Sequence, residues 1–371
     1  MSSAIGIVSF TDKIKLFARL GSYKYNTLFG TDMDVRNITF KVAFLGVCIS
    51  LLPLLASCRG SHSQTLQETR QQEKRGEGHP GGPQLGRPGG GPSIDKSGDT
   101  VLQAMIREVV PKFRQLVYTD AGTGKTMKYN LFAPADIKPG RRYPLVLFMA
   151  DASTPGESYT TPLTQGYGAL VWATDEWQAR NPCYVLVPQF AGVGVNDAYE
   201  HTDEVDRVIR LLDNVVENNP VDSNRLYTTG QSMGGMISMY YNIAYPDLFA
   251  ASLFVDCHWD TSGFDELVRH KFVYVTAGTS GHSWGNIEPL VKAAEKEGRT
   301  YDFARWSARL PQAEQSLLAE AMLAKGASVN IINFTPRSVL PDDGKGSEHM
   351  YSFDYAYKLT PVLEWIFEQV R

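Results

Sequence analysis

From residue 143 onward, short apolar runs alternate with longer amphipathic segments, and this alternation restricts the fold more than any other feature. Strands that are apolar throughout are buried on both faces, which is typical of parallel sheets between two helical layers. Strands are predicted at residues 145–149, 183–187, 225–229, 251–255, 272–276 and 329–334. Helices are predicted at residues 169–179, 202–217, 233–244, 288–297, 313–324 and 361–370.

Two further extended segments, residues 113–118 and 127–132, precede this alternation and flank a turn-forming run. They are predicted to pair as an antiparallel hairpin. The pattern is that of an α/β fold with a mainly parallel, twisted sheet, helices on both faces and an N-terminal antiparallel hairpin. Active sites of such sheets lie at the carboxyl ends of the parallel strands.

The composition is that of a globular protein. Of the 371 residues, 43% are hydrophobic and 20% are charged, which allows a full core. The chain has 36 Lys and Arg against 40 Asp and Glu, a net charge of -4, and no sustained basic block. We therefore expect no nucleic-acid partner. No feature of the sequence indicates an oligomeric state.

The N-terminal part of the chain contains a segment that is organised like an export signal. The apolar run at residues 42–55 follows basic residues and is too short to span a bilayer as a helix, so it is typical of a secretory signal. Such signals begin close to their apolar run, and Met33 is the nearest start. We expect residues 1–32 to be a mis-annotated extension and residues 33–57 to be the signal peptide.

The segment Leu55-Ala56-Ser57-Cys58 resembles the bacterial lipobox, in which small residues precede the Cys that receives the lipid. The resemblance implies a lipoprotein that is exported and anchored through Cys58 to a bacterial cell membrane, on its periplasmic or extracellular face. An N-terminal membrane anchor, or a signal cleaved without lipidation, is the alternative. Residues 58–98 are rich in Gly, Pro, Gln and charge and are predicted to be a disordered tether, followed by a folded domain at residues 99–371.

Two cysteines, Cys183 and Cys257, lie in the domain. Cys183 opens one predicted strand, and Cys257 follows another about three positions away in the sheet, ~14 Å at the usual strand spacing. A disulfide needs Cα atoms within about 7 Å of each other. We therefore predict two free, mostly buried thiols.

Ser232 lies in a Gly-x-Ser-x-Gly pattern between a predicted strand and a predicted helix. Such a turn lifts the Ser side chain out of the sheet, and Gly230 and Gly234 leave room for it. The helix N-terminus favours the negative charge that develops during acyl transfer. Ser232 is therefore the predicted nucleophile of a serine hydrolase, and a tight turn with a solvated Ser is the alternative.

From about residue 110 to the C-terminus, the chain resembles the α/β-hydrolases, and among them the esterase, polyhydroxybutyrate-depolymerase-like and "predicted peptidase" group. The resemblance rests on Asp222-Ser223-Asn224-Arg225-Leu226-Tyr227, on Gly230-Gln231-Ser232-Met233-Gly234-Gly235 and on Tyr245-Pro246-Asp247-Leu248-Phe249-Ala250. It implies the α/β-hydrolase fold and acyl-transfer chemistry that needs no metal and no organic cofactor.

The base of such an enzyme is a His after the last strand, and His349 has this place, in a predicted loop before the final helix. In the family the acid usually follows the strand predicted here at residues 272–276, but no carboxylate follows it. Asp256, at the end of the preceding strand, is the preferred acid, and Asp260 is the alternative. Both could instead cap a loop, and a Ser-His dyad also stays open.

Stabilisation of the oxyanion is expected from the backbone N–H of Met233 and from the loop that contains Ala150 and Asp151. Three aromatic side chains are expected to line the pocket: His258, Trp259 and His282.

The leading hypothesis for the function is a serine hydrolase that cleaves a carboxylic ester, either a small molecule or a polymer. A carbohydrate ester or an extracellular polyester suits a surface lipoprotein. A serine peptidase on the same fold is the second hypothesis, because amide and ester hydrolysis use the same residues. A non-catalytic binding module on a hydrolase scaffold is the third, and the missing acid after Thr276 motivates it.

Overall fold

The computed structural model describes residues 94–371. The predicted extension, signal peptide and lipidated Cys58 lie outside the described residues. The strands are β1 (Arg114–Thr119), β2 (Thr126–Phe132), β3 (Tyr143–Met149), β4 (Tyr184–Gln189), β5 (Val221–Gln231), β6 (Ala251–Val255), β7 (Phe272–Ala277), β8 (Tyr301–Trp306) and β9 (Val329–Phe334). They form a single sheet in the order β1-β2-β4-β3-β5-β6-β7-β9-β8.

Most strands of this sheet are parallel. Only the pairs β1–β2 and β2–β4 are antiparallel, while the other six neighbouring pairs are parallel. The α-helices are α2 (Thr100–Val109), α3 (Thr161–Thr164), α4 (Tyr167–Leu170), α5 (Asp175–Arg180), α6 (Asp203–Asn218), α7 (Met233–Ala244), α8 (Phe264–Leu267), α9 (Gly281–Gly285), α10 (Ile287–Lys296), α11 (Gln312–Leu323), α12 (Glu348–Tyr357) and α13 (Thr360–Glu368).

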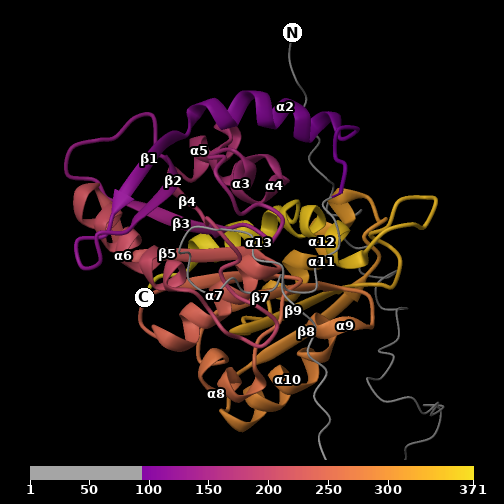
Figure 1. Ribbon diagram of the computed structural model, residues 1–371. Coiled ribbons are helices and arrows are strands. Elements are labelled where there is room, and N and C mark those ends of the chain that lie inside the picture. The colour runs from indigo at the N-terminus through magenta and orange to yellow at the C-terminus, as the bar shows by residue number, and fades with distance from the viewer. Residues whose placement is uncertain (1–93) are drawn as a thin grey trace, which may run out of the picture. The chain divides into compact units, whose positions relative to one another are not determined.

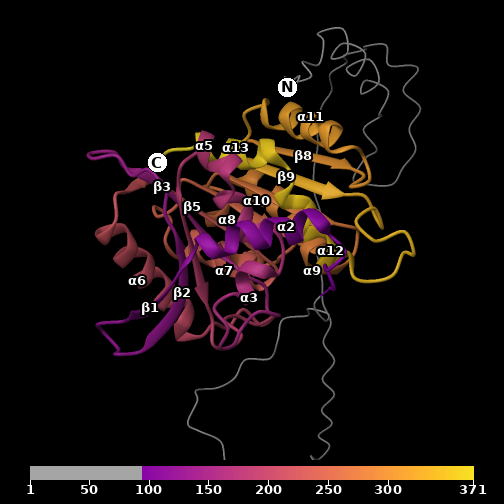
Figure 2. The same cartoon turned by 90° about the horizontal axis from the view of Figure 1, so that it is seen from above.

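Helices cover both faces of the sheet. Successive side chains of a strand point to opposite faces, so Val146 and Phe148 of β3 join one apolar cluster while Leu145 and Leu147 join the other. Helices α2, α4, α5, α11, α12 and α13 pack on the first cluster, and α6, α7, α8 and α10 pack on the second. In Figure 1, α2 lies above the strands and α10 below them; Figure 2 has α2 nearest the viewer. The predicted mainly parallel sheet, its two helical layers and the hairpin are confirmed.

A helix and a strand are among the elements that differ from the sequence-based expectation. The helix predicted at residues 169–179 is wrong, because the chain forms α4, a short 3₁₀ turn and α5, with Thr174 capping the Trp177 N–H at the start of α5. Strand β8 was not predicted. It is a partly exposed edge strand, and the charged side chains of Asp302 and Arg305 hide its apolar pattern.

The two cysteines of the domain are free and buried, as predicted. Cys183 directly precedes β4, and Cys257 lies two residues after β6. Strands β4 and β6 are three positions apart in the sheet order, as predicted. At that separation the two cysteines are too far apart to form a disulfide.

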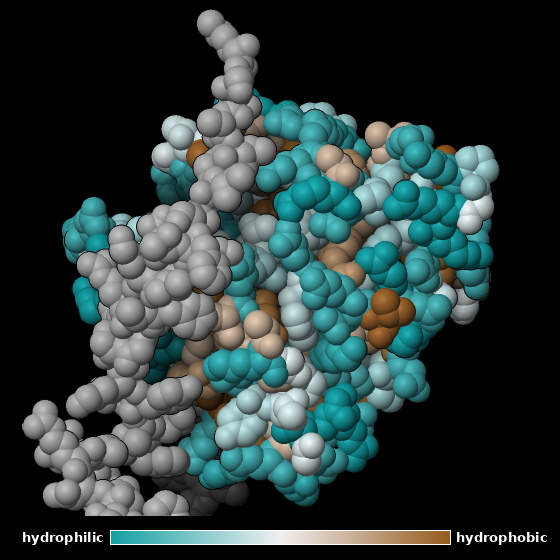
Figure 3. All heavy atoms as spheres, turned by 180° about the vertical axis from the view of Figure 1, so that it is seen from behind, coloured by the Kyte–Doolittle hydropathy of each residue, from teal (hydrophilic) through white to brown (hydrophobic). Residues whose placement is uncertain are grey.

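The end of the predicted tether contacts the domain. Ile94 packs against the first apolar cluster, and the Lys96 ammonium lies 2.7 Å from the Asp354 carboxylate. On the face in Figure 3, outside the grey atoms, hydrophobic residues are scattered among hydrophilic ones. Across residues 94–371, no helix has the length and apolar character needed to cross a membrane.

Candidate active site

Ser232 occupies a sharp turn between β5 and α7. Its backbone has φ 51° and ψ -121°, a conformation that non-glycine residues rarely adopt. The Ser232 N–H donates a hydrogen bond of 3.0 Å to the carbonyl of Val255, which ties the turn to strand β6. The turn therefore holds the Ser232 hydroxyl at the carboxyl edge of the sheet in a fixed position.

The close approach of α7 to the sheet requires glycine on both sides of Ser232. A Cβ atom at Gly234 would lie 2.0 Å from the carbonyl oxygen of Met149, and one at Gly230 would lie 2.3 Å from the carbonyl carbon of Gly234. Both neighbours are backbone atoms, which cannot move aside as a side chain can. This is the physical reason for the Gly-x-Ser-x-Gly pattern in this chain.

His349 lies beside Ser232, although the two residues are 117 positions apart in the chain. Its Nε2 lies 2.9 Å from the Ser232 Oγ, within hydrogen-bond distance. The predicted loop around His349 is wrong in part: the residue lies in the first turn of α12. The run before it is Gly-rich and loop-like, as predicted, but the helix starts at Glu348.

Asp256, and not Asp260, lies beside His349. The Asp256 Oδ1 is 3.6 Å from the His349 Nδ1, and the carboxylate is 1% exposed. Asp256 has a positive φ of 40° directly after β6, which turns the chain as the strand ends. Asp260 is exposed, and its carboxylate instead accepts a hydrogen bond of 3.0 Å from the Ser262 N–H.

Two hydroxyl groups fix the Asp256 carboxylate, and the sequence had not singled out either. Ser283 donates to Oδ1, and Ser352 donates to Oδ2 at 2.7 Å. Ser283 follows β7, where the family acid was expected, and Ser352 lies three residues after His349 on α12. In a helix, residues three positions apart are neighbours, so Ser352 lies beside His349. The sequence predicts a loop there, and Ser352 was therefore missed.

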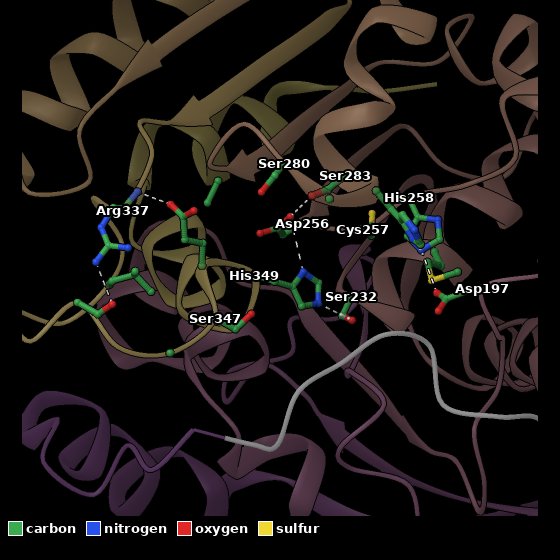
Figure 4. Close-up of a pocket in the computed structure, with 18 residues that line it drawn as sticks. Asp197, Ser232, Asp256, Cys257, His258, Ser280, Ser283, Arg337, Ser347 and His349 are labelled. Carbon is green, nitrogen blue, oxygen red and sulfur yellow. Dashed lines mark hydrogen bonds and ion pairs between the residues drawn. The ribbon is translucent and has the colours of Figure 1, made fainter.

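A cavity of about 440 Å³ opens beside this group. Ser232, His349 and Asp256 line it, and so do the predicted pocket residues His258 and His282. In Figure 4, Arg337 lies at one end and Asp197 with His258 at the other, while Ser232 and His349 lie between them.

The prediction that Trp259 lines the pocket is wrong. Its ring packs between Tyr199 and Tyr240, with ring centroids 5.3 and 5.6 Å away, and it is 7% exposed. Its backbone N–H donates to the Asn286 side chain at 2.9 Å. These contacts hold the indole in the second apolar cluster, and it does not line the cavity.

Comparison with known proteins gives a family match and several structures with a similar fold. Residues 121–302 match the family Esterase, described as "Putative esterase". A thermostable esterase of known structure superposes with a TM-score of 0.58 at 24% sequence identity, over 71% of this chain and 64% of that one. The chain has the α/β-hydrolase fold. Its matched region thus spans just under two thirds of that esterase, and none of the curated protein sequences matches it.

Two other solved structures are less similar to this chain. The feruloyl esterase module from Clostridium thermocellum is 13% identical, with a TM-score of 0.45, over 67% of this chain and 87% of that one. S-formylglutathione hydrolase from Staphylococcus aureus is 15% identical, with a TM-score of 0.41, over 68% and 98%.

The two predicted oxyanion donors belong to the backbone. Met233 is the first residue of α7, where the N–H groups of the first turn have no acceptor within the helix. Ala150 and Asp151 directly follow β3, and the Asp151 carboxylate accepts hydrogen bonds from the Gln231 side chain at 3.0 Å and the Ser153 N–H at 2.7 Å. The side chain of Asp151 therefore shapes the loop, and the oxyanion role stays a prediction for the backbone.

The protonation of His349 gives the protein a testable pH dependence. Burial lowers the pKa of His349, but the adjacent Asp256 carboxylate, together with smaller contributions from Asp151 and Asp197, raises it by more, so the net pKa lies above the usual 6.5. A general base must be neutral, and activity is therefore lost as the pH falls through this raised pKa. We expect the acid limb of the kcat/KM profile to have its midpoint above pH 6.5. Ester hydrolysis followed from pH 4.5 to 9 measures this midpoint, and a midpoint below 6.5 would contradict the assignment.

Proposed function

We propose that this protein is a serine esterase that hydrolyses carboxylic esters through an acyl-enzyme, with Ser232 as nucleophile, His349 as general base and Asp256 as the acid of the triad. The observation that carries the proposal is the 2.9 Å contact between the Ser232 Oγ and the His349 Nε2 at a strained strand-to-helix turn. The match of residues 121–302 to the esterase family supports the same reaction class.

In the proposed reaction, the Ser232 Oγ attacks the ester carbonyl while the His349 Nε2 takes the hydroxyl proton. Asp256 stabilises the imidazolium that forms and holds the ring, so that Nε2 faces Ser232. His349 then gives the proton to the leaving alcohol. A water molecule attacks the acyl-enzyme in the same way, and the acid product and free Ser232 result.

The negative oxygen of the tetrahedral intermediate requires hydrogen-bond donors. We assign them to the Met233 N–H and to a backbone N–H of Ala150 or Asp151, at the end of β3 beside the start of α7. Donors of this kind each contribute about 3 kcal/mol to stabilisation of the transition state. The dipole of α7 acts in the same direction.

For the substrate, we propose a carbohydrate ester or an extracellular polyester. The proposal rests on export of the protein and its attachment to the cell membrane through lipidated Cys58, which the sequence of residues 55–58 suggests. Radiolabelled palmitate in cells that express the full chain tests the attachment. Incorporation into the wild-type protein and its loss in Cys58→Ala are expected.

The reaction class is tested with chromogenic substrates. Purified protein is assayed with 4-nitrophenyl esters of acetate, butyrate and ferulate, and in parallel with dipeptidyl and tripeptidyl 4-nitroanilides. We expect turnover of at least one ester and no turnover of the anilides. Cleavage of anilides in preference to esters would favour the peptidase hypothesis, and failure of both by folded protein would favour the binding module.

A further inference from the structure

Three side chains with metal-binding atoms meet at one end of the cavity. Asp197 comes from the connection between β4 and α6, His258 follows β6, and His282 lies in α9 after β7. The His258 Nε2 is 3.1 Å from the Asp197 Oδ1 and 3.2 Å from the His282 Nδ1. All three atoms lie within 4.8 Å of one another.

This cluster has more electron-pair donors than protons. A carboxylate oxygen only accepts hydrogen bonds, and a neutral imidazole carries a single N–H. The His258 Nε2 faces both Asp197 and His282, so one proton cannot satisfy both contacts. A cation between the three atoms would satisfy them together.

The spacing fits a small divalent ion with nitrogen and oxygen ligands. Zn²⁺ binds His nitrogen and carboxylate oxygen at about 2.0–2.2 Å, which separates ligand atoms of a tetrahedral site by ~3.3–3.6 Å. The two measured separations of 3.1 and 3.2 Å are close to this range. Small rotations of the three side chains would place their atoms around a single ion.

The surroundings also suit a ligand role for the imidazoles. The His258 ring is buried, and its Nε2 faces the Asp197 carboxylate and the His282 ring. A neutral ring presents the lone pair that a metal needs. His282 is exposed at the mouth of the cavity, which leaves a path for an ion to enter.

We infer that Asp197, His258 and His282 bind one divalent transition-metal ion, Zn²⁺ in the first place. Two His and one carboxylate leave at least one coordination position open, as in zinc sites that bind water or substrate. That position would face the cavity shared with Ser232, where the ion would accept an oxygen atom of a bound ligand. The sequence did not predict this site, because its members lie 61 and 24 residues apart, in segments that follow three different strands.

The test uses the full chain, stripped with a chelator and dialysed, and Zn²⁺ as the probe. Isothermal titration and elemental analysis are expected to give one Zn²⁺ per chain, and added Zn²⁺ is expected to raise the melting temperature. Mg²⁺ at the same concentration is expected to do neither, since it prefers oxygen ligands. Unchanged melting temperature with no stoichiometric Zn²⁺ would overturn the inference.

Substitutions of the proposed ligands test where the ion binds. His258→Gln/His282→Gln is expected to lose the bound Zn²⁺, and Asp197→Asn, which removes the negative charge of the site, is expected to weaken binding at least tenfold. His270→Gln changes a histidine that pairs with Glu266 outside the cavity and should bind Zn²⁺ like the wild type. Equal binding by the double variant would place the ion elsewhere in the chain and contradict the inference. Covalent labelling of Ser232 by a fluorophosphonate needs no metal, so it reports on the proposed esterase separately.

Discussion

Ser232→Ala is expected to lower kcat for ester hydrolysis by about six orders of magnitude. The loss is this large because the acyl-enzyme cannot form without the hydroxyl, and His349 then has no nucleophile to activate. Triad residues act as a unit, and removal of the nucleophile alone has cost about 10⁶-fold in other serine hydrolases. Initial rates with 4-nitrophenyl butyrate, at enzyme concentrations that span three decades, measure the change.

The matched control is Ser262→Ala. Ser262 is an exposed residue of the 3₁₀ turn Thr261–Gly263, outside the cavity, and its substitution should leave kcat and KM unchanged. Both variants should melt within a few degrees of the wild type, since Ala can replace Ser without a change in volume. Retention of more than 1% of the wild-type kcat by folded Ser232→Ala would exclude Ser232 as the nucleophile.

Asp256→Asn is expected to have the second largest effect, a loss of about 10³–10⁴-fold in kcat. The amide keeps the shape of the carboxylate but cannot stabilise the His349 imidazolium, and it favours the wrong tautomer of the ring. One of the hydroxyls of Ser283 and Ser352 can still donate to the remaining carbonyl oxygen, and the oxygen of the other can accept from the new amide, so the protein should fold. Asp260→Asn is the comparison variant, and its kcat should equal that of the wild type.

The pH profile separates this electrostatic role from a purely structural one. Without the carboxylate, burial still lowers the pKa of His349 and the main opposing influence is gone. The acid limb of the residual activity in Asp256→Asn should therefore move to lower pH than in the wild type. An acid limb that stays in place, or equal losses for Asp256→Asn and Asp260→Asn, would contradict the role given to Asp256.

The parts of the fold and site that the sequence predicts are those with local signals. Strand β5, the turn at Ser232 and helix α7 follow one another in the chain, so glycine spacing and apolar periodicity are sufficient to recognise them. The parallel sheet is likewise visible because its central strands are buried on both faces. The hairpin of β1 and β2 needs only a short turn between two extended runs.

The parts that the sequence leaves open depend on distant contacts. Asp256 and Asp260 are four residues apart in the same loop, and only the backbone turn at Asp256 directs its carboxylate toward His349. The start of α12 was missed because Gly and Ser dominate the run before it. Asp197, His258 and His282 come from segments that follow three different strands. No spacing along the chain could therefore have indicated their cluster.

The central claim is that Ser232 is an activated nucleophile, and labelling with a fluorophosphonate tests it most directly. Intact-mass measurement of the folded wild-type protein should show one covalent adduct, peptide mapping should place it on Ser232, and the rate of labelling should fall as His349 is protonated. Ser232→Ala should remain unlabelled under the same conditions. A folded wild-type protein that stays unlabelled, or an adduct on another residue, would contradict the account.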